Sequence, residues 1–171
     1  MNEARRQTLA VLVDNRSGVL SQVSRLFSRK GYNIESLAVG TTDTPEVSRM
    51  TIEVIADEDQ TRLLCNQLRN LIPVHSVKLL VPEHSVRREL VFLKVNVPSS
   101  IAQNEIIQIA NIFRASVLDI SAHSLTLALI GTEEKTEALR QLAESFGILE
   151  LVRTGIIALE RGQYTIHQEI K

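Results

Sequence analysis

The fold is decided by the stretch Leu12 to Leu37, LVDNRSGVLSQVSRLFSRKGYNIESL. The apolar run Leu9 to Val13 leads into this stretch and stops at the polar turn Asn15 to Gly18. The apolar residues after the turn recur at helical spacing, at Val19, Leu20, Val23, Leu26 and Phe27. A second turn, KGYN at residues 30–33, precedes another partly apolar run. The stretch therefore predicts a strand, a helix and a second strand, joined by two short turns.

The first turn stands at the N-terminus of the predicted helix. Ser17 can cap this helix, and Gly18 has no side chain to block the approach of a ligand to the first free N–H groups. Such a helix end attracts anions, and a carboxylate would suit it. An Asn-x-Ser-Gly turn also serves in many proteins only as a turn and a cap, so both interpretations stay open at this point.

Two asparagines bracket the predicted helix. Gly31 is the expected left-handed C-cap and Asn33 opens the next strand, while Asn15 accompanies the free amides at the other end. Each Asn side chain can both donate and accept hydrogen bonds. One copy of the chain could hardly bring both asparagines onto one small ligand, because they lie at opposite ends of the helix. The pair therefore favours a site shared by two copies across a two-fold interface.

The segment DNRSGVLSQVSRLFSRKGYNIESLAVGTTDTPEVSRMTI, residues 14–52, resembles the opening of the regulatory small subunit of acetohydroxyacid synthase, also called acetolactate synthase. The N-terminal half of that subunit is an ACT domain. The resemblance covers most of the chain, since RTGIIALERG at residues 153–162 is also similar to that family. An isolated N-x-x-G before a helix is a weak motif, but its combination with GYNIESL and SRMTI in this order is specific.

The N-terminal half has the pattern βαββαβ. Asp57 can cap its second helix and Gln60 can complete a capping box, so the acidic run at residues 57–59 is expected at a helix start and not at a metal site. This helix stops before Pro73. The predicted strands are residues 8–14, 33–40, 47–56 and 74–81, and the predicted helices are residues 18–30 and a segment that begins at residue 57.

The same order of elements returns in the C-terminal half, although the two halves are dissimilar in sequence. Helices are expected to begin near Ser99 and Thr132, and strands are expected at residues 88–97, 116–121, 124–131 and 147–159. Arg153 to Gly155 is interpreted as a bulge within the last strand, with a functional turn as the alternative.

The predicted fold class is therefore α+β, with two ferredoxin-like βαββαβ domains in tandem, the N-terminal one an ACT domain. The expected boundaries are residues 1–81 for the effector-binding and dimerising ACT domain, 82–87 for a linker, 88–161 for the second domain and 162–171 for a flexible tail.

The ferredoxin-like strand order, 4-1-3-2, places the second strand of the first domain at a sheet edge. Two copies of the chain could pair there and join their sheets. In the resembled family this dimer interface holds the amino-acid effector, and the resemblance matches at Asn15, Gly18, Asn33 and Ile34. Ser17 and the backbone amides around Gly18, Val19 and Leu20 complete the candidate effector site.

The composition excludes several classes of protein. A net charge of −1 supplies no general attraction to nucleic acid or to a membrane surface, and 4% aromatic residues are too few for a base-stacking platform. No apolar run approaches the length of a membrane span, and MNEARRQT at the N-terminus lacks the apolar core of a signal peptide, so a cytoplasmic location is expected. The single cysteine, Cys65, lies among leucines and is interpreted as a packing residue.

No catalytic set stands out in the sequence. The four histidines, His75, His84, His123 and His167, are scattered and lack the spacing of a zinc site. The ferredoxin-like shape also hosts acylphosphatases, which use an arginine in a phosphate-binding loop after the first strand, and Arg16 is placed for that role. A small acylphosphatase-like enzyme is therefore kept as an alternative.

The resemblance implies a non-catalytic regulatory subunit. Such a subunit would activate the catalytic large subunit and confer feedback inhibition by a branched-chain amino acid, with valine expected first. The thiamine diphosphate, FAD and magnesium that the reaction uses are expected on the large subunit, and no cofactor or metal is expected on this chain. A free-standing amino-acid-sensing ACT module for another partner is the second hypothesis.

Overall fold

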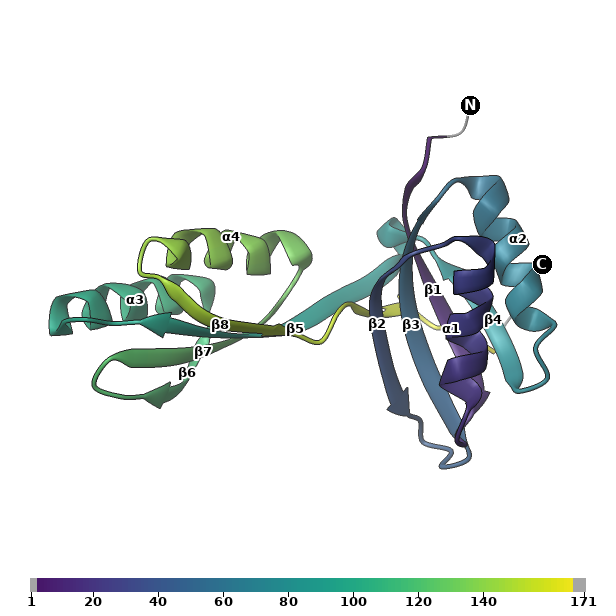
Figure 1. Cartoon of the computed structure of the whole chain (residues 1–171), viewed down its shortest axis with the longest axis horizontal. Coiled ribbons are helices and arrows are strands. Elements are labelled where there is room, and N and C mark those ends of the chain that lie inside the picture. Colours follow the sequence, from purple (N-terminus) through teal and green to yellow (C-terminus); the bar gives the residue numbers. More distant parts are fainter. Residues whose placement is uncertain (1–2, 168–171) are drawn as a thin grey trace. The chain divides into compact units, whose positions relative to one another are not determined.

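The computed structural model describes residues 3–167, which divide into two units (Figure 1). The first unit contains the chain up to residue 87 and again from residue 156, and the second unit is residues 88–155. The elements of the first unit are β1 (Arg5–Asp14), α1 (Val19–Lys30), β2 (Ile34–Thr41), β3 (Val47–Ala56), α2 (Glu58–Arg69), β4 (Val74–Leu80), the short 3-10 helix η1 (Pro82–His84) and β9 (Ile157–Glu160).

The first sheet has the order β2-β3-β1-β4, which confirms the predicted ferredoxin-like order. All neighbouring strands are antiparallel, and Leu9 of β1 stands opposite Ile52 of β3. The amphipathic helices α1 and α2 cover one face of this sheet, as their helical apolar spacing requires (Figure 1). Their buried residues join the sheet in one core, which includes Val23, Leu26, Phe27, Leu64, Cys65 and Leu68.

The other face of the first sheet is covered by residues 156–167, called the return segment because the chain comes back to the first unit there. Ala10 and Leu12 form a second apolar cluster with Leu80, Ile156, Ala158 and Ile166. Two hydrogen bonds fix this return segment, because Ser76 Oγ donates to the Ile166 carbonyl at 2.7 Å and Arg49 Nη2 donates to the Ala158 carbonyl at 2.8 Å. The return segment therefore belongs to the first unit.

This return corrects the predicted domain boundaries. The second domain was expected to run over residues 88–161 with a flexible tail after it, but residues 156–167 pack on the first unit. The tail residues 168–171 lie outside the described part. The predicted start of the second domain at residue 88 agrees with the division into units. The predicted linker, residues 82–87, contains η1 and the beginning of β5 at Ser85.

The second unit repeats the architecture of the first. Its sheet has the order β6-β7-β5-β8, with β9 also pairing with β5. Its apolar core joins the sheet to α3 and α4 and includes Leu93, Val95, Ile106, Leu125, Leu127 and Leu139. Its elements are β5 (Ser85–Asn96), α3 (Ser100–Phe113), β6 (Ser116–Ile120), β7 (Ser124–Gly131), α4 (Glu133–Glu144) and β8 (Ile148–Arg153).

Local sequence signals explain most element ends. The predicted capping box is confirmed, since the Gln60 amide donates to Asp57 Oδ1 at 2.8 Å and the Asp57 amide donates to Gln60 Oε1 at 3.0 Å. The predicted strand over residues 147–159 is wrong as one element. It divides into β8 and β9, because Gly155 between them adopts a left-handed φ of 75°. No helix among residues 3–167 is both long and apolar enough to cross a membrane.

Two adjacent isoleucines test the role of the return segment. Ile156 is 3% exposed and Ile157 is 56% exposed. Ile156→Ala should lower the free energy of unfolding of the first unit by about 2–4 kcal/mol, because it empties a buried site. Ile157→Ala should change it by less than about 1 kcal/mol. Urea unfolding, monitored by hydrogen exchange of the β1 amides, measures both changes in free energy. Equal losses in the two variants would contradict the burial of Ile156.

Candidate functional site

The turn between β1 and α1 is held by a loop that lies far away in the sequence. The Asn15 amide donates to the Glu46 carbonyl at 2.7 Å, and Asn15 Nδ2 donates to the Pro45 carbonyl at 2.7 Å. These bonds to the β2–β3 loop use the backbone N–H of Asn15 and one of its two Nδ2 hydrogens, and its side-chain oxygen remains an acceptor. Sequence reasoning gave Pro45 and Glu46 no role, because no local signal links them to a turn 30 residues earlier.

The N-terminus of α1 lacks a side-chain cap from any residue in the described range. The prediction that Ser17 caps this helix is wrong, because Gly18 is itself the N-cap, with a left-handed φ of 84°. The first helical bond runs from the Gln22 amide to the Gly18 carbonyl at 3.0 Å. The amides of the first turn, from Val19 onward, therefore have no acceptor within the helix.

The space above this helix end is open. No atom of residues 3–167 outside its chain neighbours lies within 4 Å of the position that a Gly18 Cβ would occupy. Val19 is buried in the first core, so only its backbone can reach a ligand. Leu20 is 44% exposed and offers an apolar side chain beside the free amides. The helix end can thus accept a carboxylate next to an aliphatic group.

The other predicted site residues lie at the opposite end of α1. Gly31 is the left-handed C-cap, as predicted, and exposed Asn33 donates from Nδ2 to Glu35 Oε1 at 2.6 Å. Ile34 is partly buried against the first core. The 12 residues of α1 separate the two ends by about 18 Å. One copy of the chain therefore does not bring Asn15 and Asn33 together.

The alternative sites find little support in the structure. Arg16 pairs through Nε with Asp14 Oδ2 at 3.0 Å, so a carboxylate competes with any phosphate for this guanidinium. Burial raises the pKa of the Cys65 thiol, which keeps it neutral and poorly nucleophilic. Within residues 3–167, no three His, Cys, Asp or Glu side chains are grouped so that they could hold a metal ion.

Comparison with known proteins assigns both units. A family model described as the AHAS small subunit-like ACT domain matches residues 9–76, and one described as the small subunit of acetolactate synthase matches residues 88–162. An acetolactate synthase small subunit from Mycobacterium bovis is 44% identical over 155 residues, which cover 91% of this chain and 92% of that protein. The chain belongs to the acetolactate synthase small-subunit family.

Two further relatives agree with this assignment. A probable acetolactate synthase small subunit from Methanothermobacter thermautotrophicus is 42% identical over 158 residues, which cover 92% of this chain and 94% of that protein. The crystal structure of the acetolactate synthase small subunit from Thermotoga maritima matches with a TM-score of 0.87 at 33% identity, covering 94% of this chain and 99% of that chain. The predicted family and the predicted fold, tandem ferredoxin-like domains beginning with an ACT domain, are confirmed.

Substitution of two glycines in this acetolactate synthase small-subunit homologue tests whether the left-handed backbone at Gly18 requires glycine. Gly18→Ala should lower the free energy of unfolding by about 1 kcal/mol, because an L-residue is strained at the left-handed φ. Gly40, which has equally open space and an ordinary φ, is the matched control, and Gly40→Ala should not destabilise the protein. Thermal unfolding measures the difference, and an equal loss in both variants would contradict it.

Proposed function

We propose that this chain is a non-catalytic regulatory subunit that activates the catalytic large subunit of acetolactate synthase in the cytoplasm. In this proposal it also makes the enzyme sensitive to feedback inhibition by a branched-chain amino acid, with valine as the main effector. Family membership supports the partner. Thiamine diphosphate, FAD and magnesium belong to the large subunit, and this chain holds none of them.

The effector site is supported by the open N-terminus of α1 together with the position of β2 at the edge of the first sheet. Within residues 3–167, no strand pairs with the outer edge of β2. An exposed edge of eight residues pairs readily with another strand. Two copies joined through β2 form one continuous sheet, and the turn of one copy then lies near Asn33 of the other.

The proposed site recognises each part of an aliphatic amino acid. The carboxylate accepts hydrogen bonds from the first-turn amides of α1, where the charge of the helix end contributes about 0.3–1 kcal/mol beyond those bonds. The side-chain oxygens of Asn15 and of Asn33 from the second copy accept from the ammonium group. Leu20 and Ile34 contact the aliphatic side chain, whose burial is worth about 1.5–3 kcal/mol.

Feedback follows from this shared site. Because residues of two copies bind one effector, occupancy changes how the copies are placed. A less active form of the holoenzyme that binds the effector more tightly is then stabilised, with a coupling free energy of about 1–3 kcal/mol.

Gly18→Asp tests the position of the carboxylate. It places a side chain and a negative charge where the effector carboxylate binds, so valine binding and feedback should be lost while activation of the large subunit persists. Gly18→Ala carries the same backbone strain without the charge and is the control. Calorimetric titration with valine and assays of the reconstituted enzyme measure the two effects. Equal valine affinity in both variants would remove Gly18 from the site.

Asn33→Ala tests the second half of the site. It should weaken valine binding by about tenfold, the loss of one hydrogen bond to a charged group, without unfolding the protein. Asn70→Ala, at the C-terminal cap of α2, is the control and should leave the affinity unchanged. An unaltered affinity in Asn33→Ala would remove Asn33 from the site.

Mixing the two variants tests whether the site is shared. In a dimer of one Gly18→Asp copy and one Asn33→Ala copy, a shared arrangement leaves one site doubly altered and the other intact. Valine binding should therefore return at about half of the wild-type stoichiometry. If each copy formed its own site, both sites of the mixed dimer would be defective and no recovery would occur.

A further inference from the structure

The chain crosses between its two units twice, once within β5 at residues 87–88 and once at residues 155–156. The second crossing is anchored in both units, and the first crossing is anchored by Arg87 in the first unit.

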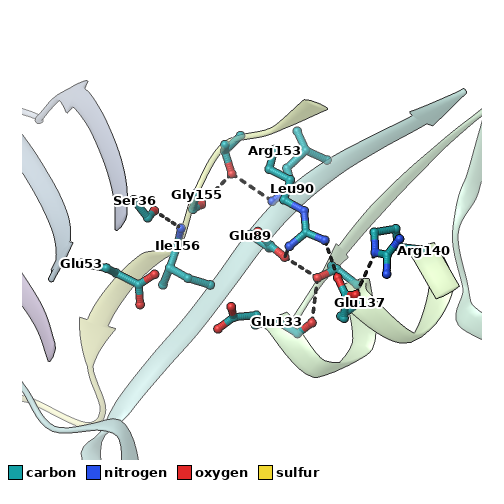
Figure 2. A network of polar contacts seen from close by, with 12 residues as sticks. Ser36, Glu53, Glu89, Leu90, Glu133, Glu137, Arg140, Arg153, Gly155 and Ile156 are labelled. Atoms are coloured by element: carbon teal, nitrogen blue, oxygen red, sulfur yellow. Dashed lines mark hydrogen bonds and ion pairs between the residues drawn. The ribbon is translucent and has the colours of Figure 1, made fainter. Parts of the chain in front are cut away.

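The second crossing has a single residue between two anchors. On the side of the second unit, the Thr154 amide donates to the Leu90 carbonyl at 3.0 Å, and the Leu90 amide donates to Thr154 Oγ1 at 3.1 Å. On the side of the first unit, the Ile156 amide donates to Ser36 Oγ at 3.1 Å (Figure 2). Gly155, with its φ of 75°, lies between them.

The first crossing is anchored on β3, the strand that pairs with β2. Arg87 Nη2 donates to Glu53 Oε1 at 2.5 Å, and the Glu53 side chain is 1% exposed. Thr8 Oγ1 also donates to this carboxylate at 3.3 Å, so Glu53 is held in a defined position. A buried carboxylate with these partners is costly to displace.

Both anchors stand in one row of the first sheet. Ser36 of β2 is the register partner of Glu53 of β3, and Figure 2 shows both residues beside the return segment at Ile156. The pairing of β2 with β3 has an irregularity between Ile34 and Ser36, which is the kind of place where a strand shifts its pairing. Ile34 and Asn33, just before this irregularity, belong to the proposed effector site.

We propose that Ser36 is a positioning residue that couples the effector site on β2 to the second unit through Ile156. This inference rests on the proposed function for the identity of the effector, but the coupling itself is a property of the free chain. A displacement of β2 at Ile34 moves Ser36 and strains its bond to the Ile156 amide. Gly155 then transmits the movement to Thr154, which is fixed to β5. By reciprocity, a change at Gly155 alters β2.

Amide exchange of the full chain, without effector or large subunit, tests this reciprocity. Gly155→Ala should accelerate exchange of the β2 amides by about threefold or more. Gly162→Ala is the matched control, because Gly162 has a similar φ of 71° in the same returning segment but lies beyond β9. In a Ser36→Ala background the effect of Gly155→Ala on β2 should disappear, whereas a Ser36→Thr background, which keeps the hydroxyl, should retain it.

Two results would overturn the inference. One is an equal response of β2 to Gly155→Ala and Gly162→Ala. The other is a response to Gly155→Ala that Ser36→Ala leaves unchanged. Thr154→Ala, which removes the hydroxyl that accepts from Leu90, should act in the same direction and replaces Gly155→Ala if that variant fails to fold.

The reconstituted enzyme provides a second readout. Ser36→Ala should bind valine with an affinity within about threefold of the wild type, yet lose about half or more of the maximal inhibition, and Ser36→Thr should keep it. Full inhibition of the Ser36→Ala enzyme would overturn the coupling. A wild-type enzyme that valine neither binds nor inhibits would refute the proposed function, and the exchange experiment would still decide the coupling.

Discussion

The burial of β1 on both faces is the constraint on which the first unit depends. Leu9, Ala10, Val11, Leu12 and Val13 follow one another in this strand, and each is at most 3% exposed. Successive residues of a strand point to opposite faces, so α1 and α2 can cover only Leu9, Val11 and Val13. The return segment supplies the second cover, and each buried aliphatic side chain contributes about 1.5–3 kcal/mol.

Both faces of the first sheet are packed against other parts of the chain, whereas the two elements of the proposed effector site lie at the periphery of the sheet. These elements are the uncapped start of α1 and the edge strand β2. The return segment covers the sheet and at the same time contacts β2 through Ser36. In this way one segment serves stability and communication together.

The sequence predicted the strand order, the capping box at Asp57 and the left-handed Gly31, because each depends on a local pattern. It failed for the return segment, since apolar residues that continue a strand pattern do not reveal which sheet they cover. A signal was available in the unbroken apolar run of β1, which is typical of a strand buried on both faces. Ser17 was wrongly predicted as a cap because Gly18, with its positive φ, took the N-cap position itself. The position of Asn15 against Pro45 depends on tertiary structure and had no local signal.

The first unit is discontinuous in sequence, which affects how the protein is made. When the ribosome has added residue 155, the second unit possesses all of its residues, whereas Ala10 and Leu12 still lack Ile156 and Ile166. The nascent chain therefore exposes an apolar sheet face until the segment from Ile156 to Ile166 has left the exit tunnel. The first unit is thus completed after the second unit, and its uncovered face favours aggregation during that interval.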